Sequence, residues 1–328
     1  MTAAIDDLRP LADHEGPFLT ILLPAPSRHA DAAERFAIRC KNALKGVSSA
    51  WPADDVEALE KELLALPHDA GAGVIVIRAS DGTTLTEFVD DPLEPAVFEG
   101  PFPRLAPLIE SRQRTVPHVL VDADKAGADL IAFDGGQVIG TGVVEGETEH
   151  IHRGHPGGWS QRRFQQRAEN TWEHNADDVA DGAAEMARSV GARLVAVAGP
   201  PRANSMVTEA LQERLHGIDV HSIEAGDADG IADEVTRLTA DLAASDSKEL
   251  IERARESMAT NDDFDGDVIA ALRAGRVETL LVHDDGDTTA DDRRVDQSIR
   301  QALATGAAIH VVPNVTVLDD GVAAVLRW

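Results

Sequence analysis

The sequence predicts a multi-domain α/β protein, on three observations. The chain has 328 residues, and one hydrophobic core rarely serves more than about 250–300 residues, so two or three domains are expected. Hydrophobic residues make up 43% of the chain and charged residues 27%, which is ordinary for a globular protein. Short apolar runs of strand length alternate with longer segments that have helical spacing. Strands and helices therefore both contribute to the predicted cores.

The first block, residues 1–113, is predicted to be an N-terminal α/β domain. Residues 18–23 form an apolar run that prolines follow, as in a buried strand. Helical spacing appears over residues 31–45 and 54–66. Residues 73–89 form a hairpin pattern, with Ser-Asp-Gly at its turn. The first helix carries the only cysteine, Cys40, at a position that favours core packing.

The second block, residues 114–247, has the order of a ribonuclease-H-like mixed sheet, because three consecutive strands precede an alternation of helix and strand. The predicted elements are strands 116–122, 128–134 and 137–144, a long helix from Ser160 to Gly191, strand 193–198, helix 205–215, strand 219–223 and a helix over 230–244. The long helix has one apolar face, formed by Phe164, Ala168, Trp172, Val179, Ala183, Met186 and Val190.

The third block, residues 248–328, is predicted to be a small three-layer α/β domain. Helices and strands alternate clearly along it. The expected elements are helix 265–274, strand 277–282, helix 293–305, strand 308–312 and strand 322–328.

The charge and the apolar runs limit the partners of the chain. The net charge of −28 repels nucleic acid on average, so any RNA contact requires a local basic patch. No apolar run approaches the roughly 20 residues that cross a bilayer, and residues 1–9 do not resemble a signal peptide. A single cysteine excludes an internal disulfide framework and suits a reducing compartment. We therefore expect a cytoplasmic protein without membrane contact, and the sequence gives no indication of its oligomeric state.

A basic segment interrupts this acidic chain between a predicted strand and the long helix. Residues 150–168 contain four arginines and three histidines but no acidic residue, although 58 of the 328 residues are acidic. The start of a helix presents free N–H groups and a partial positive charge, both suited to phosphate. Gly157 and Gly158 allow the backbone to approach a ligand closely. Without further information, a basic helix start after a flexible loop explains the same composition.

Two groups of side chains have residue types that could bind a metal. The histidines lack a neighbouring carboxylate or cysteine to complete a ligand set, which favours solvated or RNA-facing roles over metal binding; they are His150, His152 and His155. Four acidic residues around the first two strands of the second block could hold Mg²⁺ as in ribonuclease-H-like nucleases; they are Asp122, Asp124, Asp129 and Asp134. Turn roles suit Asp124 and Asp134 better. We expect no metal and no cofactor.

The basic segment resembles the catalytic loop of the eukaryotic and archaeal class-I peptide chain release factors, in which Gly-Gly-Gln-Ser precedes an Arg-Phe pair. The matching residues are Gly157, Gly158, Ser160, Arg163 and Phe164, with Arg167 following. Trp159 stands at the family's glutamine position, and the nearest glutamine is Gln161. This arrangement is more similar to the Vms-type peptidyl-tRNA hydrolases and their bacterial and archaeal relatives. The resemblance covers roughly residues 115–328, and no codon-recognition motif precedes it.

The resemblance implies a three-domain protein. Residues 1–113 would form the N-terminal α/β domain and residues 114–247 a release-factor-like catalytic domain with the Gly-Gly loop. Residues 248–328 would form a three-layer α/β domain similar to one found in pelota and in a ribosomal protein.

The resemblance also implies a translation-rescue release factor that hydrolyses peptidyl-tRNA on stalled ribosomes or large subunits, without a cofactor. Gly157 and Gly158 would admit the loop to a narrow site. Gln161 would orient water or hydrogen-bond the oxyanion, because glutamine cannot be a general base. The implied RNA-binding residues are Arg153, Trp159, Ser160, Arg162, Arg163 and Arg167. Two alternatives stay open, namely a catalytically silent protein that binds the ribosome or tRNA, and a nuclease that acts on the tRNA 3′ end.

Overall fold

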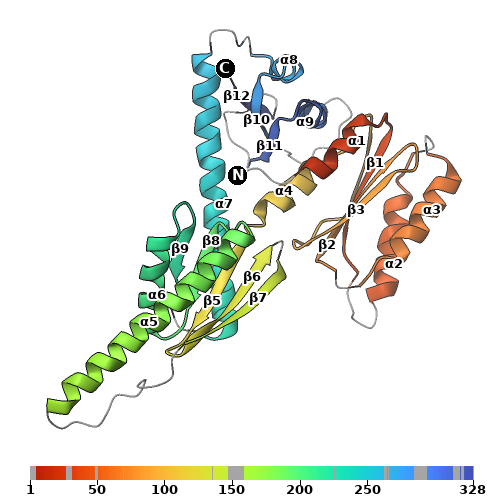
Figure 1. Cartoon of the computed structure of the whole chain (residues 1–328). Coiled ribbons are helices and arrows are strands. Elements are labelled where there is room, and N and C mark those ends of the chain that lie inside the picture. Colours follow the sequence, from red (N-terminus) through yellow and green to blue (C-terminus); the bar gives the residue numbers. More distant parts are fainter. Residues whose placement is uncertain are drawn as a thin grey trace. The chain divides into compact units, whose positions relative to one another are not determined.

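In the part of the chain that it describes, the computed structural model contains three β-sheets and helices that cover them (Figure 1). Contacts group the chain into two compact units, Met1–Arg114 with Ala244–Trp328, and Thr115–Ala243. Among the described residues, no helix combines the length and apolar character needed to span a membrane. The residues that the structure describes are 5–26, 32–48, 51–68, 70–134, 136–146, 159–224, 226–261, 264, 266–283, 294–312, 318 and 321–327, with the side chains of 159–170 left out.

An antiparallel sheet of order β3-β2-β1-β4 forms the N-terminal part of the first unit. Its strands are β1 (Phe18–Pro24), β2 (Gly73–Ala79), β3 (Thr84–Val89) and β4 (Ala96–Gly100). Successive residues of β1 face opposite sides of the sheet. Leu19 and Ile21 pack against α2 and α3, whereas Phe18 packs in the core on the opposite face. The predicted strand and hairpin are confirmed, whereas β4 was not predicted.

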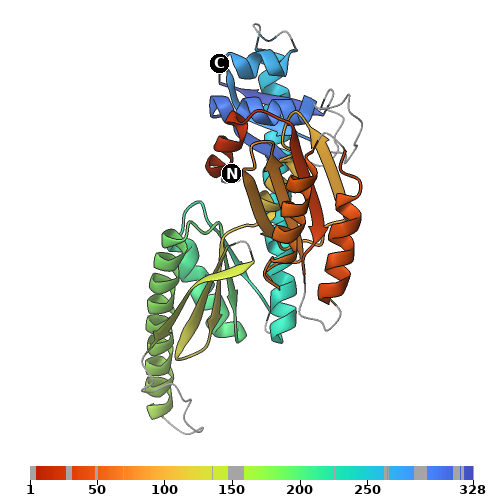
Figure 2. The same cartoon turned by 90° about the vertical axis from the view of Figure 1, so that its right-hand side faces the viewer.

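Helices α2 (Ala32–Leu44) and α3 (Ala53–Leu64) lie side by side on one face of this sheet (Figure 2). Both were expected from their spacing. Cys40 is fully buried in the core between them, as predicted, and burial raises the pKa of its thiol to about 11. At neutral pH the thiol is therefore protonated and acts as a small apolar group.

A second sheet in this unit has the order β11-β10-β12, with β10 parallel to β11 and antiparallel to β12. The strands are β10 (Val277–Val282), β11 (Ala308–Val311) and β12 (Val322–Leu326). Its helices are α8 (Val268–Arg273) and α9 (Arg294–Thr305), together with the end of α7 (Ala228–Thr260). One face packs on α8 and α9 and the other on α7, through Leu250 and Ala254. These are the three layers expected of this block.

One hydrophobic core joins the two sheets of the first unit. It includes Phe18 and Ile77 from the N-terminal sheet and Leu280 and Ile309 from the C-terminal sheet. Three further elements contribute to it, η1 (Asp6–Leu8), α1 (Arg9–Asp13) and α4 (Ala106–Arg114). The N-terminal and C-terminal blocks therefore share buried apolar surface within one unit, while the three-domain division inferred from the sequence stays a prediction.

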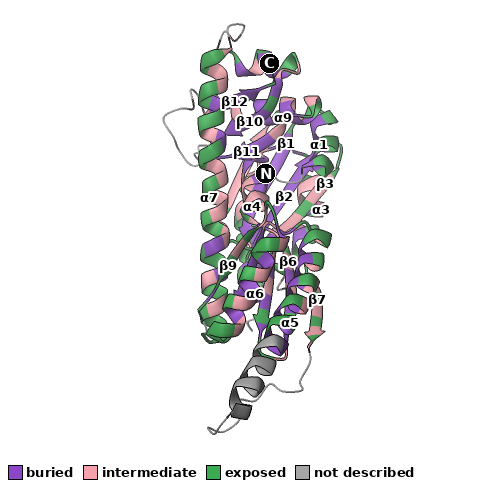
Figure 3. Ribbon diagram, turned by 60° about the vertical axis from the view of Figure 1, so that its left-hand side comes forward, coloured by how far each residue is buried: buried purple, intermediate pink, exposed green. Residues whose placement is uncertain are grey.

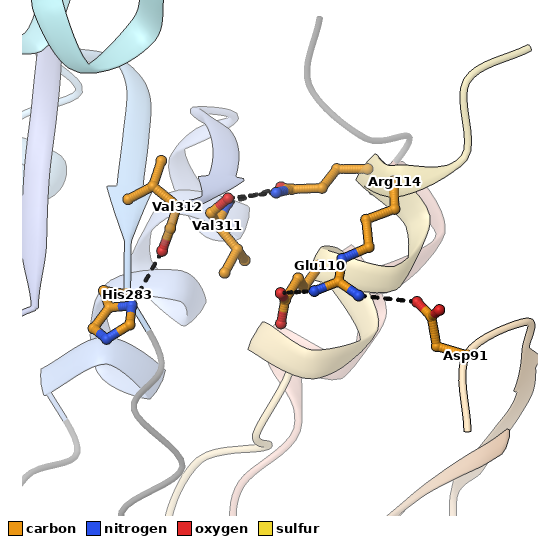
Figure 4. Close-up of polar contacts among 7 residues, drawn as sticks. Asp91, Glu110, Arg114, His283, Val311 and Val312 are labelled. Carbon is orange, nitrogen blue, oxygen red and sulfur yellow. Dashed lines mark hydrogen bonds and ion pairs between the residues drawn. The ribbon is translucent and has the colours of Figure 1, made fainter. Parts of the chain in front are cut away.

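Polar contacts reinforce this unit around α4 (Figure 4). The side chain of Gln113 makes two hydrogen bonds with the backbone of Val311. Its amide group donates to the Val311 carbonyl oxygen, and its Oε1 accepts from the Val311 N–H at 2.8 Å. Arg114 bridges Glu110 at 2.6 Å and Asp91 at 3.1 Å. The amide of Gln113 thus satisfies the backbone of edge strand β11.

His310 on β11 is expected to make this unit sensitive to acid. The side chain is 3% exposed, its Nε2 lies 2.9 Å from Ser247 Oγ, and burial lowers its pKa to about 4. The unfolded chain takes up a proton near pH 6.5 and the folded chain only near pH 4. The contribution of neutral His310 to the free energy of unfolding is therefore fully present above pH 6.5. It is lost as the pH falls towards 4, by about 3 kcal/mol in total.

Urea unfolding at several pH values measures this loss. His310→Gln keeps a polar group near Ser247 without titrating, so the difference in stability between wild type and variant should shrink as the pH falls from 6.5 to 4. An unchanged difference across that range would show that His310 does not carry the effect.

The second unit contains a five-stranded mixed sheet of order β7-β6-β5-β8-β9. Its strands are β5 (His118–Ala123), β6 (Gly127–Asp134), β7 (Gln137–Glu145), β8 (Leu194–Ala198) and β9 (Asp219–Ser222). The first three pair antiparallel, and β8 lies parallel to both β5 and β9. This is the mixed order that the sequence predicts for the block.

Helices cover both faces of this sheet. On one face lie α5 (Trp159–Ser189) and α6 (Pro201–Arg214), and on the other the first turns of α7. Every residue of the interior strand β8 is buried, because helices cover both of its faces. Figure 3 shows an exposed face along the length of α7.

The continuity of α7 corrects one prediction. The sequence pattern indicated an end to this helix near Ala244. In the structure α7 runs for 33 residues to Thr260, while the predicted domain boundary after Ser247 stays a prediction. After Gly230 this segment has no glycine or proline to end the helix.

Candidate functional site

The predicted catalytic loop joins β7 to α5. Gly157, Gly158 and Arg153 lie outside the described residues. Trp159, Ser160, Gln161, Arg162, Arg163 and Arg167 lie in the first turns of α5, where the structure describes the backbone but not the side chains. Because α5 begins at Trp159, Ser160 lies within the first turn and not before it. The strand predicted before the glycine pair and the helix predicted after it are therefore both present.

The later turns of α5 are held firmly against the sheet. The predicted apolar face is confirmed at Trp172, Val179 and Ala183, which are all buried. The helix ends as predicted, since Gly191 has a φ of +64° and the N–H of Ala192 donates to the carbonyl oxygen of Ala187, as in a glycine-terminated helix. Close packing of this face fixes the part of α5 that follows the loop.

Two ion pairs tie α5 to α6. Arg214 on α6 donates to Asp181 at 2.6 Å and to Asp177 at 2.8 Å. These hydrogen bonds, first that to Asp181, raise the pKa of Arg214. Both carboxylates are more than half exposed, so the pairs orient the two helices more than they stabilise the fold.

Beside this face, a cavity of about 350 Å³ lies where the parallel strands β5 and β8 end. The carboxyl ends of parallel strands are the usual place for ligands in open α/β sheets. Gly199 brings the two strand ends together, because its φ is +132° and a Cβ there would lie 2.0 Å from the carbonyl oxygen of Ala123. The cavity lining is Asp124, Lys125, Trp172, Asn175, Ala176, Val179, Pro200, Arg202, Ala203, Met206 and Val207.

Among the described side chains, two cations contact the indole ring of Trp172 in this cavity. The guanidinium carbon of Arg202 lies 4.5 Å from the ring centroid, and Lys125 Nζ lies 5.5 Å from it. Trp172 is only 8% exposed, whereas Lys125 and Arg202 are exposed. A buried indole thus positions two solvent-facing positive charges at the cavity.

The turn after β5 shapes the same cavity. Asp124 Oδ1 accepts from the N–H groups of Ala126 at 2.6 Å and Gly127 at 2.9 Å, which confirms the turn role predicted for it. The buried amide of Asn175 donates to the carbonyl oxygen of Lys125 at 2.9 Å. Position 125 is therefore held between a turn and α5.

The other predicted acidic residues do not gather here. Asp122 and Asp129 face each other across β5 and β6 and are both exposed. Among the described residues, no group of three or more histidine, cysteine or acidic side chains could hold a metal ion. The histidines of the basic segment, His150, His152 and His155, lie outside the described residues.

Sequence reasoning missed the cavity. Periodicity assigned Trp172 to the core face, which is correct, but gave no sign that cations cover its ring. Lys125 follows β5 and Arg202 opens α6, and only the parallel pairing of β5 with β8 brings them together. Gly199-Pro200-Pro201 directly after a buried strand was the available signal.

Comparison with known proteins finds a family match that covers most of the second unit and continues to the end of α7. Residues 117–260 match the family model described as bacterial archaeo-eukaryotic release factor family 2. The uncharacterized protein Rv2629 of Mycobacterium tuberculosis is 26% identical, over 98% of this chain and 96% of its own. A pelota homolog of Hyperthermus butylicus is 30% identical over 151 residues, 41% of each chain. The archaeal Pelota of a ribosome-bound model with ABCE1 is 14% identical, with a TM-score of 0.46 over 100% of this chain and 95% of that chain.

The matched residues 117–260 include the strand–loop–helix segment, and the residues of the Gly-Gly motif stand within it. Over this segment, the chain is similar to the archaeo-eukaryotic release factors.

Proposed function

We propose that the chain is a translation-rescue release factor, a cytoplasmic protein that hydrolyses peptidyl-tRNA on stalled ribosomes or large ribosomal subunits. The observation that carries the proposal is the release-factor match over residues 117–260, which contains the Gly-Gly loop and all of α5. The similarity to a pelota homolog supports it. The Vms-type branch of the superfamily stays a prediction from the Gly-Gly and Ser-Gln spacing.

The chemistry requires attack of water on an ester carbonyl and stabilisation of an oxyanion. Gly157 and Gly158 would let the backbone approach the ester closely. The amide of Gln161 would orient the water or donate a hydrogen bond to the oxyanion, a contribution worth roughly 10²–10³ in rate for comparable donors. In a chain of net charge −28, the arginines of this segment would supply the local phosphate contacts.

The packing of α5 supports this assignment. A helix whose later turns are buried against the sheet and paired with Arg214 gives the loop before its first turn a rigid base. Preorganisation of this kind lowers the cost of orienting the reacting groups.

A second candidate function is a catalytically silent protein that binds the ribosome or tRNA. Trp159 at the release factors' glutamine position favours it. In that case the loop would still contact RNA, with Trp159 stacked on a base, but the ester would stay intact.

Gln161→Ala tests the proposal in a purified system of stalled large subunits that carry peptidyl-tRNA. We expect wild type to release the peptide and Gln161→Ala to slow release about 100-fold. Gln165→Ala, one helical turn later, is the matched control and should stay within about threefold of wild type.

Each other outcome contradicts the proposal in its own way. Equal rates for wild type and Gln161→Ala would refute the role of Gln161. Co-sedimentation of wild type with large subunits without release would identify the silent binder. Release together with a shortened tRNA, detected on a denaturing gel, would identify cleavage of the tRNA 3′ end.

A further inference from the structure

The cavity beside Trp172 has two kinds of lining that together select a ligand. Its wall is apolar, formed by Ala176, Val179, Ala203, Met206 and Val207 next to the indole. Its volume of about 350 Å³ lies at the lower end of the range for small-molecule sites. A planar heterocycle could therefore enter, whereas an inorganic anion would leave the apolar wall unused.

The mouth of the cavity is polar and carries charges of both signs. Lys125 and Arg202 lie over the indole at 5.5 and 4.5 Å. Both side chains are exposed, and a guanidinium or ammonium group in contact with an aromatic face has further N–H donors whose hydrogen bonds a phosphate can accept. Asp124 and Asn175 also line the cavity. A carboxylate accepts hydrogen bonds from sugar hydroxyls.

We propose that this cavity binds a nucleotide of an RNA strand. The base would lie against the apolar wall, the sugar near Asp124, and the phosphate between Lys125 and Arg202. An aliphatic ligand would make no favourable contact with the two cations. A bare phosphate would make no favourable contact with the apolar wall. In a chain of net charge −28, two cations held at one cavity also provide local attraction for a polyanion.

Helix α5 links this cavity to the loop, which favours an RNA strand over a free nucleotide. Trp172 lies thirteen residues after Trp159, the first residue of α5, so the two are ~20 Å apart along the helix. The inference extends the proposed function by a second RNA contact within the same unit. It is tested by binding without peptide release, so either proposal can fail while the other stands.

The test measures binding of the full chain to two probes, adenosine 5′-monophosphate by calorimetry and a fluorescein-labelled hexaadenylate by anisotropy. Ala203→Leu fills the cavity and leaves both cations in place. Arg202→Gln removes one cation and leaves the wall. We expect each variant to weaken the binding of both probes about tenfold. A melting curve checks that Ala203→Leu is folded; if it is not, Arg202→Gln and Lys125→Gln decide the question, since both side chains are exposed.

Two controls separate this site from other basic surfaces. Arg237→Gln on α7 removes the same charge from an exposed position that pairs with Glu234 and Asp241, and should change neither affinity by more than about twofold. Arg163→Gln in the predicted catalytic loop should weaken the hexamer alone and leave the mononucleotide unaffected.

Three results would overturn the proposal. If folded Ala203→Leu binds both probes like wild type, the cavity holds no base. If Arg237→Gln loses as much affinity as Arg202→Gln, binding reflects overall charge. If the mononucleotide binds and the hexamer does not compete with it, the site takes a free nucleotide and not an RNA strand.

Discussion

Replacing Gly199 with alanine is expected to destabilise the second unit by about 3 kcal/mol or more. Gly199 has a φ of +132°, a conformation that side chains rarely adopt, and its Cβ would lie 2.0 Å from the carbonyl oxygen of Ala123. The obstructing atoms belong to the backbone of β5, so they cannot move without breaking the pairing of β5 with β8. Hydrogen exchange of β8 and α6 measures the loss.

Gly191 offers a matched control for this substitution. It also has a positive φ, +64°, but nothing lies within 4 Å of the position that a Cβ would take. Gly191→Ala should therefore cost only about 1 kcal/mol, the strain of the left-handed conformation. If both variants lose the same stability, close contact between the ends of β5 and β8 is not what requires glycine at position 199.

Asn204→Leu is expected to have the second large effect, a loss of about 3 kcal/mol. Asn204 is 3% exposed, and its amide donates to the carbonyl oxygens of Val197 at 2.9 Å and Ile223 at 2.7 Å. Its Oδ1 accepts from the Thr208 hydroxyl at 3.2 Å. Leucine has a similar size but cannot replace these bonds, and buried polar groups left without a partner are costly.

The neighbouring Ser205→Ala serves as the control, because Ser205 is exposed and its hydroxyl donates to the nearby Glu209 on the same helix. Its stability should change by no more than about 0.5 kcal/mol. Urea unfolding followed by circular dichroism compares the two. A loss below about 1 kcal/mol for Asn204→Leu would mean that this amide does not anchor α6 to β8 and to the segment after β9.

Both large effects bear on the candidate nucleotide site. Gly199 and Asn204 set the start of α6, which carries Arg202, Ala203 and Met206 into the cavity. Variants at these two positions should therefore lose both stability and nucleotide binding. Arg202→Gln should weaken nucleotide binding without a loss of stability, because the Arg202 side chain is exposed.

Apolar runs and helical periodicity predicted most of the helices and strands, because both patterns arise from burial of side chains. Apolar runs such as residues 18–23 and 194–198 and the period of α5 follow from burial, which acts on residues near one another in sequence. The order of strands in the second unit follows from short connections and from the rule that parallel strands need a crossover. The length of α7 was missed, because a helix that continues from one unit into another carries no local signal at the boundary.

The amino-acid sequence by itself determined the α/β class, the mixed sheet and the acid-free segment with Gly157, Gly158 and Gln161, because composition and periodicity are local properties. Only the tertiary structure decided that the N-terminal and C-terminal sheets share one core and that Lys125 and Arg202 meet over Trp172. Contacts between residues distant in the chain depend on which strands pair and where they end, and neither is encoded in the residues' immediate neighbours.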